Sequence, residues 1–145
     1  MDATAGRTPR HLWVVGVISL LWNGFGAFDY VMSQTRNEAY LAQFSEAERA
    51  YFESFPAWTE AAWALGVWGA VLGSVLLLAR SRHSVFAFAI SLGGLAVSTV
   101  FQFVLSSPPA SLQNAGMIGL NVFIWIVAIG LLLYAFWLRS DNVLR

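Results

Sequence analysis

The sequence predicts an all-α membrane protein, a four-transmembrane-helix bundle that forms one domain over residues 1–145. Hydrophobic residues make up 58% of the chain and charged residues only 11%, whereas soluble domains carry about 25% charged residues. A membrane core of ~30 Å is crossed by roughly 20 apolar residues, and four stretches of the sequence reach that length. Together they use most of the 145 residues, which leaves no room for a separate soluble domain.

The predicted membrane helices are residues 12–34, 57–79, 85–105 and 115–138. The first is longer than the apolar core of a signal peptide and no A-x-A cleavage site follows it, so we expect it to be retained. The short loop Arg80–Ser84 makes the second and third helices antiparallel neighbours. The loop 106–114 is rich in Pro and Ser and carries no charge, which predicts a turn region.

The distribution of arginine predicts the orientation of the bundle. All basic residues of the chain are arginine, and only Arg36 and Arg49 lie in the first loop. The other six lie on the N-terminal segment, the second loop and the C-terminal segment: Arg7, Arg10, Arg80, Arg82, Arg139 and Arg145. Because basic loops stay in the cytoplasm, both termini are expected there and the first and third loops outside.

The first outside loop, residues 35–56, is expected to contain a short amphipathic helical segment on the outer surface. Ser45-Glu-Ala-Glu48 has the pattern of a capping box. Apolar and polar residues alternate around it at roughly helical spacing. The apolar set is Leu41, Phe44, Tyr51, Phe52 and Phe55, and the polar set is Glu38, Glu46, Arg49 and Glu53. Pro56 suits the first turn of the helix that follows.

Asp29 lies inside the first apolar segment, where a carboxylate is costly and therefore suggests a functional site. Depth can be estimated by counting from the inner arginine of each helix, which is Arg10, Arg80, Arg82 or Arg139, at about 1.5 Å per residue. This places four polar residues at nearly one level, about 27–30 Å from that side: Asp29, Glu60, Gln102 and Asn121. Asn23 is deeper in the membrane, at roughly 20 Å. These five residues form the candidate polar cluster.

Two interpretations fit this common level. The residues can simply mark the outer membrane interface, where polar side chains are common. Alternatively, they converge in a polar cup that is open to the outside and covered by the amphipathic loop. Two carboxylates facing each other in such a cup would permit proton-coupled binding of a cation or of sugar-like hydroxyls. Asp29 and its neighbour Tyr30 point in different directions on a helix, so only part of this motif can line a cup.

Small residues predict how the helices pack. Gly66, Gly69 and Gly73 give the second membrane helix a face that allows a close approach to a neighbour. On the first helix, small and polar residues including Gly16 and Asn23 form a narrow stripe that should face the bundle. The fourth helix is almost wholly apolar, so much of it is expected to face lipid or another subunit.

No feature of the sequence predicts an enzyme. The absence of cysteine excludes disulfides, thiol catalysis and thiolate metal sites. The phosphate-binding, zinc-protease and serine-hydrolase motifs are also absent. His11 and His83 fall at the interface near the termini, which favours an interfacial role over haem ligation. We expect no cofactor, no metal and, at zero net charge, no nucleic-acid partner.

Three stretches of the chain resemble a known family: RHLWVVG at 10–16, LWNGFGAFDY at 21–30 and FPAWTEAAWALGVWG at 55–69. They are similar to an uncharacterised family of small bacterial four-helix inner-membrane proteins that often carry an automatic "sugar transporter" label. The resemblance extends over nearly the whole chain and implies a multi-pass protein of the bacterial inner membrane. It implies no substrate and no site residues.

The sequence therefore supports two hypotheses about function. The first is a small transport-type or ligand-binding protein that uses the outward-facing polar cluster. The alternative is a non-catalytic accessory or assembly subunit of a larger membrane complex. In either case the partners are the lipid bilayer and either further copies of the chain or a larger membrane protein, because four short helices enclose little space alone.

Overall fold

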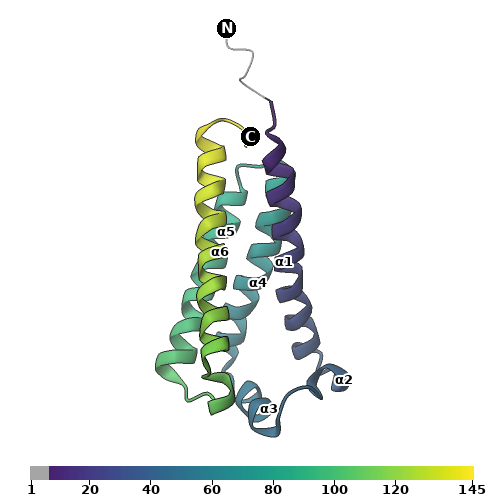
Figure 1. Ribbon diagram of the computed structural model, residues 1–145, viewed down its shortest axis with the longest axis vertical. Coiled ribbons are helices and arrows are strands. Elements are labelled where there is room, and N and C mark those ends of the chain that lie inside the picture. Colours follow the sequence, from purple (N-terminus) through teal and green to yellow (C-terminus); the bar gives the residue numbers. More distant parts are fainter. Residues whose placement is uncertain (1–6) are drawn as a thin grey trace.

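The computed structural model describes residues 7–145, and the long elements of this part of the chain are helices (Figure 1). Four of them are long and apolar enough to cross a membrane, as predicted. They are α1 (Arg10–Gln34), α4 (Ala57–Leu78), α5 (Ser84–Val100) with its continuation η1 (Phe101–Leu105), and α6 (Ala115–Ser140). The short helices are α2 (Glu38–Leu41), α3 (Glu46–Glu53) and η2 (Ala110–Leu112).

The long helices form an elongated bundle with two distinct ends (Figure 1). The ends of α1 and α6 nearest the chain termini lie together at one end, here called the termini end. The helices α2 and α3 lie at the opposite end, here called the loop end. Helix α4 packs between α1 and α5, and α5 also contacts α6. Side chains close the ring between α1 and α6, where His11 Nδ1 and the Tyr134 hydroxyl share a hydrogen bond of 2.6 Å.

The helix boundaries follow local chain chemistry. Helix α1 begins two residues before the predicted start because Pro9, in extended conformation, provides its N-cap. Pro56 plays the same part for α4, one position earlier than predicted. The capping box of α3 is confirmed, since Ser45 accepts from the Glu48 amide and Glu48 accepts from the Ser45 amide. The predicted helix 85–105 is α-helical to Val100 and then continues as a single π-helical segment.

Helices α4 and α5 approach closely along small residues. The carbonyl of Gly66 accepts a 2.5 Å hydrogen bond from the hydroxyl of Ser91. A Cβ added at Gly69 would lie 3.1 Å from a backbone carbonyl of α5, and one added at Gly73 would lie 2.6 Å from the ring of Phe88. The three glycines named from the sequence therefore all face α5, where a larger residue would push the helices apart.

The best-packed part of the bundle is its termini end. A buried cluster there combines side chains from all four long helices and from the C-terminal segment: Leu12, Leu77, Val85, Phe88, Leu131, Ala135, Leu138 and Leu144. Backbone hydrogen bonds of 2.8 and 2.9 Å join Arg145 to Arg80 and Arg82 and hold this segment against the α4–α5 loop. No residue in the loop-end half of α6, from Ala115 to Val127, is fully buried. Close packing at one end therefore leaves room for a cavity at the other.

Candidate functional site

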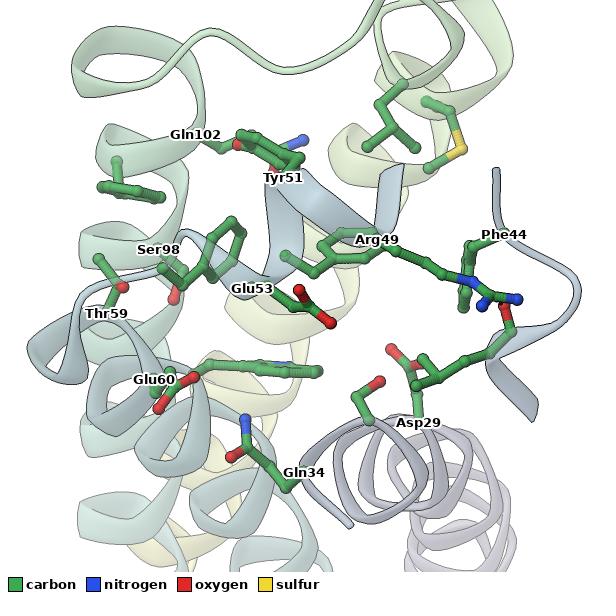
Figure 2. Close-up of a pocket in the computed structure, with 18 of the residues that line it drawn as sticks. Asp29, Gln34, Phe44, Arg49, Tyr51, Glu53, Thr59, Glu60, Ser98 and Gln102 are labelled. Carbon is green, nitrogen blue, oxygen red and sulfur yellow. Dashed lines mark hydrogen bonds between the residues drawn. The ribbon is translucent and has the colours of Figure 1, made fainter. Parts of the chain in front are cut away.

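A cavity of about 570 Å³ lies at the loop end of the bundle (Figure 2). Asp29 lines it from α1, Glu60 from α4, Gln102 from η1 and Asn121 from α6. Each of the four long helical segments thus contributes one of the four polar residues that the sequence places at a common depth. The volume lies within the range of small-molecule sites, about 300–1,000 Å³. The four polar residues therefore line a single cavity.

Asn23, the fifth member of the predicted cluster, is not among the cavity residues. Its Nδ2 donates to the Ala70 carbonyl at 3.2 Å and to the Ser74 hydroxyl at 2.9 Å. Ser74 is fully buried between the helices. The deeper position of Asn23 therefore serves the contact between α1 and α4 and not the cavity.

Replacing Asn23 by alanine is expected to lower the free energy of unfolding by about 0.6 kcal/mol, and at most by ~1.7 kcal/mol, as for other interhelical hydrogen bonds in membranes. Thermal unfolding in detergent of this variant, of Ser74→Ala and of the double variant would measure the coupling. The double variant should cost less than the sum of the two single changes. Strictly additive losses would show that the two side chains do not interact.

Asp29 and Tyr30 diverge as expected for adjacent residues of a helix. The carboxylate of Asp29 lines the cavity. The ring of Tyr30 packs edge-on against Trp63, with centroids 4.9 Å apart, and against Trp68 at 6.2 Å. Tyr30 thus joins α1 to α4 beneath the cavity, and Trp63, which also lines it, is held in a fixed orientation.

The loop between α1 and α4 covers the cavity and adds residues to its lining (Figure 2). Arg49 and Glu53 of α3, which the sequence assigns to the polar side of an amphipathic surface helix, both line the cavity. They are four residues apart and so share one face of the helix. Figure 2 shows the Glu53 carboxylate reaching into the middle of the cavity and Arg49 extending toward Phe44.

Other lining residues could have been found from helical spacing. Trp63 follows Glu60 by three residues, and Ser98 precedes Gln102 by four, so each pair shares a helix face. Once one member of a pair is placed in a cavity, its partner becomes a candidate. The sequence alone gave no reason to choose that face over the lipid-exposed one.

Hydrogen bonds fasten the covering loop at both sides. The hydroxyl of Tyr40 in α2 donates to Asp29 of α1. The hydroxyls of Tyr51 and Ser106 share a hydrogen bond of 2.8 Å, and Ser111 donates to Glu48 at 2.8 Å. Helix α2 is therefore tied to α1, and α3 is tied to the segment between η1 and α6.

A series of aromatic rings reinforces this cover. Successive rings meet edge to face with centroids 5.1 to 6.0 Å apart, from α1 across the loop to η1 and α4. The rings are Phe28, Tyr40, Phe44, Phe52, Phe55, Phe101 and Trp58. Each such aromatic pair adds about 0.5–1.5 kcal/mol beyond the burial of its surface. The rings therefore stabilise the packing of the covering loop on the bundle.

The hydrogen bond from Tyr40 to Asp29 is kept over the whole physiological pH range. Burial, and then the hydrogen bond and the charge of Asp29, together raise the pKa of Tyr40 from 10.0 to about 12. The phenol is therefore neutral, and able to donate, below its ordinary pKa. This contribution to stability is lost only as the pH rises through about 12.

The hydrogen bonds that the Glu48 carboxylate accepts should be lost in acid. Hydrogen bonds from the Ser45 amide and then from the Ser111 hydroxyl lower the pKa of Glu48 below 4.5. Its stabilisation of α3 is therefore fully present above pH 4.5 and is lost as the pH falls through the lowered pKa. Hydrogen exchange of the α3 amides, corrected for intrinsic rates, should show less protection in Glu48→Gln than in the wild type at neutral pH, and no difference in strong acid.

Glu46→Gln is the matched control for this prediction, because Glu46 is an exposed acid in the same helix outside the capping box. It should leave the exchange of α3 unchanged at neutral pH. A difference between Glu48→Gln and the wild type that persists unchanged in strong acid would contradict the assignment.

The charge of the cavity lining is mixed with an acidic excess. Three carboxylates, Asp29, Glu53 and Glu60, face two guanidinium groups, Arg36 and Arg49. No group of three His, Cys, Asp or Glu side chains within residues 7–145 could hold a metal ion. Amides, hydroxyls and aromatic rings make up much of the remaining lining. Such a surface can hydrogen-bond a polar molecule and stack against its apolar parts.

Comparison of the chain with protein-family models, with curated proteins and with solved structures finds no match in any of the three.

Proposed function

We propose that this chain is an integral protein of the bacterial inner membrane that binds a small hydrophilic molecule in an outward-facing cavity, as a transport-type or solute-binding protein. The observation that carries the proposal is the convergence of Asp29, Glu60, Gln102 and Asn121 on one cavity. Each comes from a different membrane-spanning segment. Polar side chains in such segments are costly when they face lipid and typically mark a substrate path.

The state of these side chains supports a binding role. None of the side-chain hydrogen bonds within residues 7–145 involves the carboxylate of Glu60 or the amides of Gln102 and Asn121. Polar groups at this depth require partners, and a bound solute with its water would supply them. By contrast, the amide of Asn23, outside the cavity, is satisfied by the protein itself.

The arginine distribution supports the direction in which the cavity opens. Six of the eight arginines lie at the termini end, on the ends of α1 and α6, the segments next to them and the α4–α5 loop. The positive-inside rule places that end in the cytoplasm. The loop end, which holds the cavity, would then face the outside, with α3 as its cover.

A pair of cavity-filling and control variants tests the proposal. Ser98 lines the cavity, whereas Gly93 on the same helix is exposed and a Cβ added there meets nothing within 4 Å. Thermal unfolding of purified protein would be measured against a panel of sugars, polyols, amino acids and amines. A solute at a hundred times its Kd stabilises the folded state by about 2.7 kcal/mol.

We expect at least one solute to stabilise the wild type and Gly93→Phe, and to have no effect on Ser98→Phe. Equal stabilisation of Ser98→Phe would contradict a binding site in this cavity. No stabilisation of the wild type by any solute of the panel would count against the proposed function itself.

The accessory-subunit alternative is favoured by a different observation. Only 6% of the apolar stretch of α6 is buried in the bundle, whereas 39% of the corresponding stretch of α5 and η1 is buried. A helix this exposed can pack against lipid, another copy of the chain or a larger membrane protein. Purification in mild detergent should bring down a stoichiometric partner if the alternative holds, and a homogeneous homo-oligomer would contradict it.

A further inference from the structure

We infer that the ligand of the cavity is an organic cation that also carries a hydroxyl, held between the carboxylates of Glu53 and Glu60 and against the ring of Trp63. This inference rests on the proposed function, because it names the ligand class of the same cavity. Four features of the lining carry it: the negative excess of charge, the lack of a metal-ligand set among the described residues, the aromatic surface and the polar side chains of the α5 wall.

The charge of the cavity lining has a negative excess, because three carboxylates face only Arg36 and Arg49. Asp29 accepts a hydrogen bond from Tyr40, and Arg49 is held by its Nε, which donates to the Leu41 carbonyl at 2.8 Å. Glu53 and Glu60 have no comparable hydrogen bond to the part of the chain that the structure describes. Figure 2 shows Glu53 and Glu60 on facing elements of the cavity, with Arg49 directed to the side. A cation placed between the two carboxylates would satisfy both.

The acidic side chains and the size of the cavity favour a molecule over a bare ion. A metal ion needs its oxygen ligands at about 2.0–2.6 Å, and no group of three acidic or histidine side chains in the described residues is arranged to hold one. The cavity of about 570 Å³ instead has room for a small organic molecule.

The aromatic surface favours an alkylated ammonium. Trp63 follows Glu60 by three residues, so the indole and the carboxylate share one face of α4. Tyr30 holds that indole through a 75° edge-to-face contact. A cation over an indole face gains about 0.5–1 kcal/mol at exposed sites and about 2 when desolvated. Phe44 and Phe52 of the covering loop line the same cavity and extend the apolar wall.

Polar side chains on the α5 wall indicate a second contact. Gln102 lines the cavity, and its side-chain amide makes no hydrogen bond to the described residues. A ligand hydroxyl reaching this wall would bond to that amide. Ser98, four residues earlier, lies on the same face; its Oγ is buried without a hydrogen-bond partner among the described residues, which is costly, and it would join the contact once its side chain turned toward the cavity. Choline, with one quaternary ammonium and one hydroxyl, is the simplest probe of this chemistry.

The test compares choline with its neutral carbon isostere, in which a tert-butyl group replaces the trimethylammonium group. Titration calorimetry on the purified full chain would measure both. We expect choline to bind about tenfold more tightly or better, because only the charged ligand gains the carboxylate and cation–π contacts. Glu60→Gln and Glu53→Gln should each weaken choline binding about tenfold and leave the isostere unchanged.

Glu46→Gln is the control, since Glu46 is an exposed acid of α3 outside the cavity lining. It should bind choline like the wild type. If Glu60→Gln does not fold, the comparison of choline with its isostere on the wild type still decides the question. Equal affinity for both ligands would overturn the inference of a cation.

The two proposals fail differently. Binding of a neutral polyol or sugar, abolished by Ser98→Phe but indifferent to Glu53→Gln and Glu60→Gln, would overturn the cation and keep the binding cavity. Absence of binding by every probe, charged or neutral, would overturn both.

Discussion

Replacing Gly94 by alanine is expected to lower the free energy of unfolding by about 3 kcal/mol, at the upper end of the usual cost of overpacking. A Cβ added at Gly94 would lie 2.5 Å from the Ala62 carbonyl oxygen and 2.6 Å from the Gly66 amide nitrogen. Both atoms belong to the backbone of α4, so no side-chain rotation can relieve the clash. Helices α4 and α5 would have to separate along their closest contact.

The neighbouring glycine supplies the control. A Cβ added at Gly93 meets nothing within 4 Å, so Gly93→Ala should be neutral or stabilising by at most about 1 kcal/mol through helix propensity. Thermal or denaturant unfolding in detergent would compare the two variants. Equal stability of Gly93→Ala and Gly94→Ala would show that the helices do not approach as described.

Combining Asp29→Asn with Glu60→Gln is expected to reduce solute uptake into proteoliposomes about 100-fold, with folding and membrane abundance unchanged. Each change removes one negative charge from the cavity lining; a hydrogen bond to a charged group is worth about 1.5–3 kcal/mol, and every 1.4 kcal/mol is tenfold. Asparagine keeps an acceptor for Tyr40, so the covering loop should stay fastened. The substitutions therefore test the charges of the cavity and not the hydrogen bond between Tyr40 and residue 29.

The uptake measurement would use whichever solute stabilises the wild type in the binding panel. Glu38→Gln is the matched control, because Glu38 is exposed at the start of α2 and does not line the cavity. Uptake that is unaffected by the double change would contradict a role of these carboxylates in transport and would favour the accessory-subunit alternative.

The fold was largely predictable because its signals are local. Apolar length marks each long helix, and Pro56 marks the start of α4. The observed ends lie within two residues of the predicted ones, apart from α5. Its last turn is π-helical, and the apolar run from Phe101 to Leu105 gives no sign of this.

Helix ends without glycine were harder to foresee. Arg36, Arg80 and Asn142 all have positive φ, at 52°, 57° and 57°, just beyond the ends of α1, α4 and α6. Their backbone amides satisfy the last carbonyls of those helices. Glycine is the usual residue at such positions, so the sequence carries no marker of these turns.

The candidate site was predictable in depth but not in direction. The rise of a helix fixes how far Asp29, Glu60, Gln102 and Asn121 lie along the bundle. Whether they turn toward each other depends on the rotation of each helix, which tertiary packing determines. The same reason explains why Asn23 was grouped with them although it bonds to α4.

The covering loop shows a second limit of the sequence. Its amphipathic pattern correctly predicts α3, but a pattern cannot say that Arg49 and Glu53 turn toward a cavity. Nor does it show that Tyr40 reaches Asp29. These contacts join residues of different helices, and they form only when the loop packs on the bundle.

Thiol accessibility tests most directly the central claim, that polar residues of separate helices share one water-accessible cavity. The chain has no cysteine, so single cysteines can be placed at Gln102 and Asn121 and, as lipid-facing controls on the same segments, at Val100 and Val122. Neither control residue lines the cavity, and the exposed fractions of their side chains are 49% for Val100 and 52% for Val122. A membrane-impermeant thiosulfonate reagent would be added to the outside of intact cells. We expect Gln102→Cys and Asn121→Cys to react and Val100→Cys and Val122→Cys to stay unmodified, whereas equal reactivity of cavity and control positions would contradict the claim.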